Sequence, residues 1–181
     1  NFVDGVVITG GEPSIYQELV ELCKKIKELG FKIKIETNGS NPEMLKKLID
    51  DKLIDYAAID IKAPKNLYAK VAGVDVDTRK IEESVKLLVD IGTGFELRTT
   101  LCPIIDKEAR WLSELEVKEM AGWIKEIAGK NVKWIIQPFV SREKEDILDE
   151  NFMIGKLPEK MEETPKKILE KAREIRDKEL K

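Results

Sequence analysis

The sequence contains no histidine in its 181 residues. This absence excludes catalytic triads that use an imidazole base and metal sites that are built on histidine. Acid or base chemistry by the chain itself would have to use aspartate, glutamate, lysine or tyrosine. We therefore expect chemistry by carboxylates or amines, or chemistry that a bound cofactor supplies.

Cysteine is nearly absent as well, because the chain has only Cys23 and Cys102. Two cysteines do not make a disulfide framework, and no CxxC or CxxxC spacing is present to hold a metal. Apolar runs are short: none approaches the roughly 20 residues that a membrane span requires, and no basic segment followed by an apolar leader opens the chain. We expect a soluble, cytoplasmic protein without a membrane partner.

Neither sign of charge is in large excess. The chain has 32 basic and 35 acidic residues, a formal net charge of -3 and a pI near 5.4. Without a uniform positive field, nucleic acid is not expected as a partner. Charged residues make up 37% of the chain and glutamine occurs only at positions 17 and 137, a balance that is consistent with a thermophilic source.

Short apolar runs alternate with amphipathic segments along the chain. The predicted strands are residues 6–8, 31–36, 56–62, 95–101 and 132–139. The predicted helices are residues 14–29 and 41–52, the region of 81–89, residues 113–127, and the charged segment 165–181, for which a solvated helix is expected. The length suits one domain, with a core at residues 1–140 and a C-terminal part, 141–181, made of an exposed excursion and that final helix.

Strands that alternate with helices predict an α/β fold with a parallel sheet, open or curled into a barrel, whose ligands bind at the carboxyl ends of the strands. Glycine or polar residues lie at or near the end of every predicted strand: Gly10, Gly11, Glu12, Glu36, Thr37, Asn38, Asp60, Lys62, Arg98 and Gln137. Taken singly, each has a structural explanation as a turn residue or a surface ion pair. Their occurrence at all five strands favours a binding site, because apolar residues would continue a buried strand more cheaply.

The charges of this set indicate the kind of ligand. Three carboxylates, Glu12, Glu36 and Asp60, stand against two cations, Lys62 and Arg98. This set of residues at the strand ends, called the rim from here on, offers hydrogen-bond acceptors to an ammonium group and donors to a carboxylate. Its charged members carry one negative charge in excess. It suits a zwitterionic amino-acid group that carries a further positive charge, and the two glycines before Glu12 would let that group approach the backbone closely.

The segment TGGEP, residues 9–13, resembles the GGEP motif of radical S-adenosylmethionine enzymes, in which backbone and acid receive the amino group of the cofactor's methionine end. Further segments resemble, in order, successive motifs of the glycyl-radical-enzyme activating enzymes, most of all the archaeal-type activating protein of anaerobic ribonucleoside-triphosphate reductase. They are ETNG (36–39), IDIKAP (59–64), VAGV (71–74), FELRTTLCPIID (95–106) and WIIQPF (134–139). The resemblance covers nearly the whole chain up to about residue 140 and implies a partial (β/α) barrel of the radical S-adenosylmethionine type, with its helices outside and its first βα units missing.

The resemblance also implies roles for residues of the rim. Gly10, Gly11 and Glu12 would bind the methionyl amine, and Asp60 with Lys62 would hold the amino-acid end of S-adenosylmethionine. Arg98 would bind anionic groups and Gln137 would contact the ribose, while Thr37 and Asn38 belong to the same cofactor-binding set. In related activating enzymes the residues that correspond to Glu36, Thr37 and Asp60 hold a monovalent cation.

The sequence departs from this family in several places. The CxxxCxxC loop, whose thiolates bind three irons of a [4Fe-4S] cluster, is missing, and neither Cys23 on a predicted helix nor Cys102 after the fourth strand replaces it. Because the chain begins with Asn1, we expect that the cluster loop has been lost by truncation and that the 181-residue chain alone is inactive. Glu36 stands in place of the usual Asp, residues 102–104 replace a Pro-Gly turn, and Gln137 replaces a common His.

By this resemblance the chemistry belongs to the cofactor. A reduced cluster donates an electron to the sulfonium, which yields methionine and a 5′-deoxyadenosyl radical that removes hydrogen from a backbone glycine of the partner enzyme. The implied partners are a glycyl-radical enzyme and an electron donor such as flavodoxin or ferredoxin. Two other hypotheses stay open: another radical S-adenosylmethionine enzyme that modifies a nucleoside or a small molecule, and a cluster-free module that binds an adenosyl compound or a partner protein.

Overall fold

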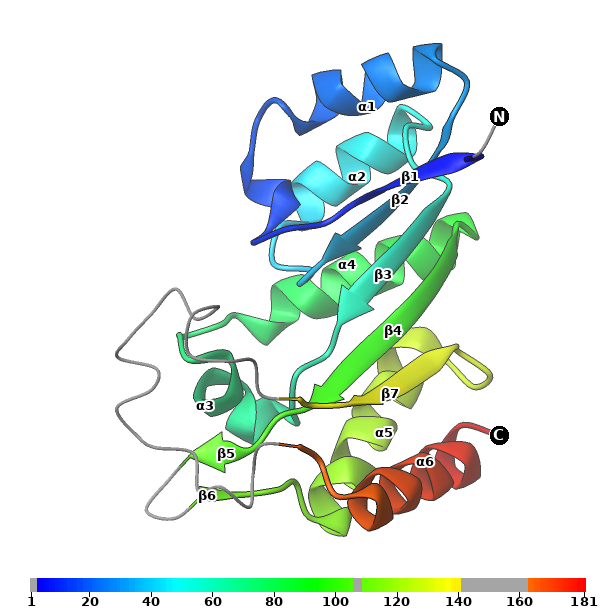
Figure 1. Ribbon diagram of the computed structural model, residues 1–181. Coiled ribbons are helices and arrows are strands. Elements are labelled where there is room, and N and C mark those ends of the chain that lie inside the picture. Colours follow the sequence, from blue (N-terminus) through cyan, green and yellow to red (C-terminus); the bar gives the residue numbers. More distant parts are fainter. Residues whose placement is uncertain (1–2, 106–108, 141–162) are drawn as a thin grey trace.

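The computed structural model describes residues 3–105, 109–140 and 163–181. Five parallel strands form one sheet in the order β1-β2-β3-β4-β7 (Figure 1). Their bounds are Gly5–Ile8 for β1, Lys32–Thr37 for β2, Tyr56–Asp60 for β3, Gly94–Leu101 for β4 and Trp134–Pro138 for β7. The predicted α/β class with a parallel sheet is confirmed, and each predicted strand is present.

Alternating side chains explain which face of this sheet the described helices cover. Ile33, Ile35, Ile59 and Leu97 are at most 1% exposed, and they point towards the helices. Four long helices lie on that side (Figure 1): α1 (Leu19–Glu28), α2 (Pro42–Asp50), α4 (Thr78–Ile91) and α5 (Glu114–Ala128). Because successive residues of a strand point to opposite faces, the charged residues between these apolar ones point to the open face.

The helix ends follow the signals in the sequence. Asn41 caps α2, since its side-chain oxygen accepts a hydrogen bond from the Met44 amide at 3.2 Å. Ser113 and Glu116 form a capping box at the start of α5. Gly92 ends α4 with a φ of 72°, a left-handed conformation that favours glycine. These local signals therefore determine where the helices begin and end, and the strands lie between those points.

The predicted final helix is present as α6 (Lys166–Leu180), and most of its residues are exposed or half-buried, but one side of it is packed against the protein. It packs beside α5 and buries three apolar side chains, those of Ala172, Ile175 and Leu180. Arg173 donates to the Ile136 carbonyl at 2.9 Å, and Arg176 donates to the Trp134 carbonyl at 3.1 Å. These guanidinium groups satisfy carbonyls on the free edge of β7, and that edge is thereby protected from pairing with another chain.

The helix predicted over 14–29 begins only at Leu19, and η1 (Pro13–Ile15) lies where its first residues were expected. Four further short elements have no counterpart in the predictions: η2 (Lys65–Leu67), α3 (Tyr68–Ala72) and the hairpin of β5 (Ile104–Ile105) with β6 (Ala109–Arg110). Elements of two to five residues are too short for a hydrophobic period to be visible. The predicted excursion falls mainly on residues 141–162, outside the described part, so the division at residue 140 stays a prediction. Within the described helices, none has the length and apolarity to cross a membrane.

Candidate functional site

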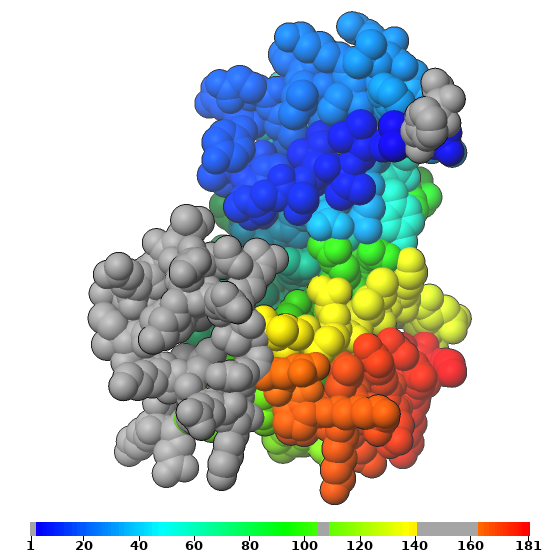
Figure 2. Space-filling model, viewed as in Figure 1, coloured from blue at the N-terminus to red at the C-terminus, as the bar shows by residue number. Residues whose placement is uncertain are grey.

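The open face of the sheet carries the charged residues that the sequence places near the strand ends. The register puts Glu36, Ala58 and Glu96 in one row across three strands, and Asp60 beside Arg98 in the next row. Figure 2 shows this face between the blue atoms of β1 and the yellow atoms of β7. Side chains that are 60 residues apart in the sequence are therefore neighbours because the strands are parallel and in this register.

Arg98 lies between two carboxylates on this face. Its guanidinium Nη1 is 2.7 Å from Glu36 Oε1, and its Nε is 3.5 Å from Asp60 Oδ1. The hydrogen bond from Arg98 lowers the pKa of Glu36. Burial raises the pKa of Asp60, and the cations of Lys62 and Arg98 offset this only in part. The Asp60 side chain is 41% exposed, so part of its carboxylate is open to solvent.

Glu12 joins the end of β1 to the end of β2. Its carboxylate accepts hydrogen bonds from the Ser14 amide at 3.0 Å, from Thr37 Oγ1 at 2.7 Å and from the Asn38 amide at 2.7 Å. These three bonds give the glutamate after the glycine pair a structural role. Its carboxylate fixes the loop after β1 relative to the loop after β2. Contact of Glu12 with a ligand's ammonium group stays a prediction.

The glycine pair leaves the backbone accessible before Glu12. Gly10 has a φ of 138°, which an L side chain rarely adopts, and a Cβ at Gly10 or Gly11 would meet no atom within 4 Å. The absence of a side chain at both positions exposes main-chain carbonyl and amide groups along this stretch. Among the described residues, nothing packs against these two Cα atoms on the side where a Cβ would stand.

Asp60, Lys62 and Arg98 converge on one small pocket of about 50 Å³. Thr100 lines the same pocket, and Gln137 donates to Thr100 Oγ1 at 3.2 Å from the next strand. The structure thus brings the polar residues of β3, β4 and β7 to one place, as the sequence predicted. Burial raises the pKa of the Cys102 thiol on the same wall, so that this thiol stays protonated and is a poor nucleophile.

The two halves of the rim are continuous. Asn38, whose amide binds Glu12, lines a second pocket of about 390 Å³ together with Lys62. The polar groups therefore run from the glycine pair through Asn38 and Lys62 to Arg98. Together they form one edge at the carboxyl ends of the strands, where open α/β sheets bind their ligands.

The structure does not bring the three predicted cation ligands together. Glu36 and Thr37 are consecutive in β2, so their side chains point to opposite faces of the sheet. Thr37 is buried and bonds to Glu12 and to the Gly39 amide, while Arg98 occupies the space between Glu36 and Asp60. Across the described ranges no three His, Cys, Asp or Glu residues are grouped so as to hold a metal ion.

A second cluster on the open face was not recognised from the sequence. Glu96 accepts from Lys34 at 3.0 Å and pairs with Lys133 at 2.6 Å, and the Tyr56 hydroxyl lies 3.3 Å away. Burial alone would raise the pKa of Glu96, but the bonds from the two lysines outweigh it and lower the pKa to about 2. Apolar and charged residues alternate strictly in FKIKIE and FELR, which places these charges on one face of the sheet. This two-residue period is the sequence signal from which the cluster could have been predicted.

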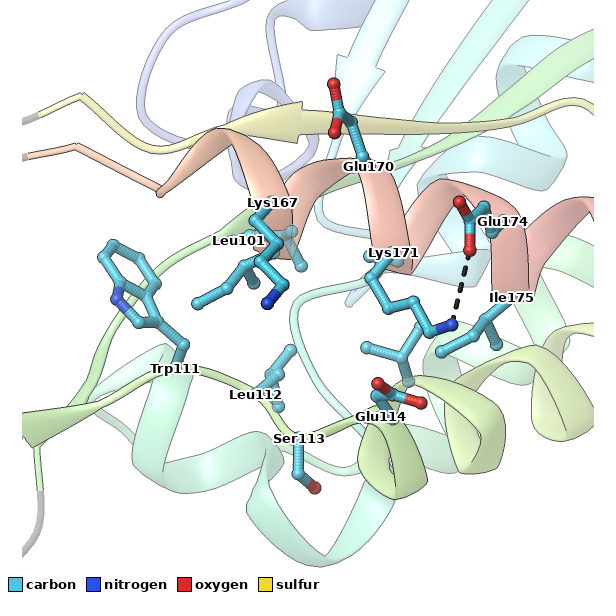
Figure 3. A pocket seen from close by; sticks show the side chains of 13 residues that line it. Leu101, Trp111, Leu112, Ser113, Glu114, Lys167, Glu170, Lys171, Glu174 and Ile175 are labelled. Atoms are coloured by element: carbon cyan, nitrogen blue, oxygen red, sulfur yellow. Dashed lines mark hydrogen bonds and ion pairs between the residues drawn. The ribbon is translucent and has the colours of Figure 1, made fainter.

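A larger pocket of about 510 Å³ lies away from the rim, between α6 and the segment that leads into α5 (Figure 3). Trp111 and Leu112 line one side, and Lys171 pairs with Glu174 at 3.4 Å on the other. Size alone would favour this pocket as a ligand site. None of the charged residues of the rim lines this pocket. We therefore assign the candidate site to the rim, where those charged groups converge.

The match to known proteins defines the class of the chain. A family profile for the Radical SAM superfamily matches residues 1–111. A Methanocaldococcus jannaschii protein, named as a candidate glycyl-radical enzyme activating enzyme, is 32% identical over 166 residues, which cover 89% of this chain and 64% of that protein. A Saccharolobus solfataricus protein, named as a GTP 3′,8-cyclase, is 32% identical over 92 residues, which cover 50% of this chain and 30% of that protein.

Solved structures share the fold. A crystallised domain of pyruvate-formate lyase-activating enzyme from Bacteroides vulgatus has a TM-score of 0.68 at 15% identity, covering 98% of this chain and 95% of that one. Streptococcus suis SuiB, crystallised with S-adenosylmethionine, has a TM-score of 0.52 at 20% identity, covering 73% of this chain and 29% of that one.

These likenesses confirm the α/β architecture of a partial barrel with a parallel sheet. The chain belongs to the radical SAM superfamily, because the family profile covers more than half of it. It spans less than two thirds of the length of the curated relatives that it matches. The predicted membership of the radical S-adenosylmethionine (radical SAM) enzymes is thereby confirmed.

Proposed function

We propose that the rim at the carboxyl ends of the strands binds S-adenosylmethionine, as part of an enzyme that activates a glycyl-radical enzyme. One observation carries this proposal: the polar groups from Gly10 to Gln137 form a continuous edge around Asp60, Lys62 and Arg98. The partner would be a glycyl-radical enzyme, with anaerobic ribonucleotide reductase as the favoured class. The 32% identity to the M. jannaschii protein supports a glycyl-radical enzyme as the partner, and the ribonucleotide reductase class rests on the sequence resemblance alone.

The donor set of the rim fits the cofactor. Lys62 and Arg98 can donate to the methionyl carboxylate, while the Asp60 carboxylate and the accessible backbone at Gly11 can accept from the ammonium. Gln137, in the edge strand β7 and bonded to Thr100, would contact a sugar hydroxyl in this proposal. These residues bind and orient the cofactor; none is proposed as an acid or base.

The chain does not fit an iron–sulfur cluster. Cys23 is fully buried on α1, and Cys102 lies beyond β4, so the two thiols are on separate elements and no third cysteine exists. We therefore assign no step to a cluster held by these residues. Asp60, Lys62 and Arg98 would hold the amino-acid end of S-adenosylmethionine, and the bound cofactor would supply radical chemistry if a reduced cluster were present on another segment. A cytoplasmic flavodoxin or ferredoxin would supply the electron.

Replacing Lys62 by alanine should weaken the affinity for S-adenosylmethionine by about tenfold or more, because one charge-assisted bond to the carboxylate is lost. Titration calorimetry on the 181-residue chain measures this. Lys47→Ala removes an exposed lysine of α2 and serves as the matched control, with unchanged affinity. Equal affinity in the wild type and in Lys62→Ala would place the cofactor elsewhere.

A form of the protein that carries a CxxxCxxC segment tests the activity itself. Reconstituted with iron and sulfide, it should turn brown and cleave S-adenosylmethionine when reduced with dithionite. Activation of a glycyl-radical enzyme should then produce a glycyl radical signal in electron paramagnetic resonance. A colourless product in the same test would favour the cluster-free binding module instead.

A second candidate is another radical reaction on a nucleoside or small molecule. The GTP 3′,8-cyclase from S. solfataricus favours it, since that protein matches half of this chain at 32% identity. The two candidate functions differ in the molecule that gives its hydrogen to 5′-deoxyadenosine. Deuterium from a labelled partner glycine in the 5′-deoxyadenosine product selects the activating enzyme, and its absence with cofactor turnover on a nucleotide selects the second candidate.

A further inference from the structure

Tyr68 is buried where the chain leaves β3. It begins α3, and only 2% of its surface is exposed. Its hydroxyl accepts a hydrogen bond from the Lys62 amide at 3.3 Å and donates one to the Asp60 carbonyl at 3.1 Å. One side chain thus bridges the backbone on both sides of Ile61.

The strand β4 holds the remaining backbone groups of this tripeptide. The Ile61 amide donates to the Arg98 carbonyl at 2.8 Å, and Thr99 Oγ1 donates to the Ile61 carbonyl at 2.6 Å. All four main-chain polar groups between the Asp60 carbonyl and the Lys62 amide are therefore bonded. Two of these bonds come from the neighbouring strand and the other two from the Tyr68 hydroxyl alone.

This arrangement fixes the direction of the two side chains that line the pocket. Residues two apart in an extended chain point to the same face, so Asp60 and Lys62 both point to the rim. β3 ends at Asp60, and the loop after it has no further strand partner to fix Lys62. The Tyr68 hydroxyl replaces the ladder hydrogen bonds that the chain gives up there.

The Tyr68 ring is itself held in place by α4 and α5. The ring of Trp123 packs edge-on against it, with centroids 6.0 Å apart and planes at 86°. Trp123 donates to Glu82 at 3.0 Å, and Lys65 pairs with Glu82 and lies 5.3 Å from the centre of the Trp123 ring. Burial raises the pKa of Tyr68 well above its usual value, so the hydroxyl keeps its proton and can donate.

We propose that Tyr68 is a positioning residue for the cofactor's amino-acid end, acting through the backbone of residues 60–62. Its hydroxyl holds the Lys62 ammonium and the Asp60 carboxylate in the direction that meets the carboxylate and ammonium of the ligand. This inference rests on the proposed function, since it names the residue that shapes the same site. It concerns only the amino-acid half of the ligand and leaves the adenosine half untouched.

The test compares two ligands on the 181-residue chain. S-adenosylmethionine carries the amino-acid end, whereas 5′-methylthioadenosine lacks it. Tyr68→Phe keeps the ring and removes the hydroxyl, so calorimetry should show about tenfold weaker binding of S-adenosylmethionine and less than about twofold change for 5′-methylthioadenosine. A purely structural defect would lower both affinities together.

Tyr56→Phe is the matched control, because it makes the same change at the other end of β3. The Tyr56 hydroxyl lies 3.3 Å from Glu96 and away from the rim, so both affinities should stay as in the wild type. Equal losses for the two ligands in Tyr68→Phe, or no loss, would overturn the inference. A wild-type chain that binds neither ligand would instead reject the proposed function itself.

Amide hydrogen exchange on the wild type keeps the inference testable if Tyr68→Phe does not fold. The Lys62 amide should exchange about as slowly as the Ile61 amide, because both are bonded. Rapid exchange at Lys62 beside slow exchange at Ile61 would show that the hydroxyl does not hold the loop, and would overturn the inference.

Discussion

Replacing Glu12 by glutamine should lower the free energy of unfolding by about 2 kcal/mol and weaken S-adenosylmethionine binding by about tenfold or more. The carboxylate accepts from three donors, at 2.7 Å from Thr37 and Asn38 and at 3.0 Å from Ser14. In glutamine one oxygen becomes an amide that donates, so it faces an N–H or O–H donor instead of accepting from it. At least one bond is lost, and the others lose their charge assistance.

The binding loss follows from the position of Glu12 and not from unfolding alone. The three bonds tie the loop after β1, which carries the accessible glycine backbone, to the loop after β2. When they weaken, the two loops no longer present their groups at a fixed separation. The affinity should therefore fall even at temperatures where the variant is fully folded, as circular dichroism and calorimetry on the same sample would show.

Glu18→Gln is the control for Glu12→Gln. Glu18 precedes α1 and makes no capping hydrogen bond with its side chain, so the same chemical change should leave stability and affinity within experimental error. A Glu12→Gln variant as stable as the wild type would show that the three bonds do not join the loops in solution.

The fold was predictable because its signals are local. In β2 the apolar residues Ile33 and Ile35 alternate with charged ones, and in the helices the caps at Asn41 and Ser113 stand next to the apolar period that they begin. Once five strands alternate with helices, a parallel sheet with its ligands at the carboxyl ends follows from topology. The convergence of Asp60, Lys62 and Arg98 is a consequence of that topology, which the structure bears out.

The partners of individual side chains were not predictable, because they depend on register. Arg98 meets Glu36 across 62 positions of sequence, and Glu96 meets Lys34 across the same separation. A predicted cation site at Glu36, Thr37 and Asp60 did not take account of strand alternation, which turns Thr37 to the helix side. Tyr68 gave no sequence signal at all, since its role depends on a loop geometry that no period encodes.

Replacing Arg98 by methionine should destabilise the fold by about 2 kcal/mol near neutral pH and leave Glu36 and Asp60 without the guanidinium between them. Fully buried pairs lose roughly 3–5 kcal/mol when one partner is removed. The smaller value is expected here because the Asp60 side chain is 41% exposed and because Lys34 still lies 3.4 Å from Glu36.

The deficit of Arg98→Met should depend on pH with a definite sign. Without the cation, the folded pKa of Asp60, which burial already raises, rises further, and the pKa of Glu36 loses the hydrogen bond that lowers it most. A carboxyl whose folded pKa is raised binds its proton more readily when folded, so the variant gains stability as the pH falls through that raised pKa. Urea unfolding should therefore show the full deficit in weakly alkaline solution and a smaller one in weakly acidic solution.

Arg98→Lys separates charge from geometry in the same experiment. Lysine keeps a cation near both carboxylates but loses the planar fork that reaches Glu36 and Asp60 together, so its deficit should be smaller and nearly independent of pH. A deficit in Arg98→Met that does not change with pH would mean that the guanidinium stabilises the sheet by packing alone. In that case the positive charge of Arg98 would not balance the charges of Glu36 and Asp60. The charge balance proposed for cofactor binding would then be rejected.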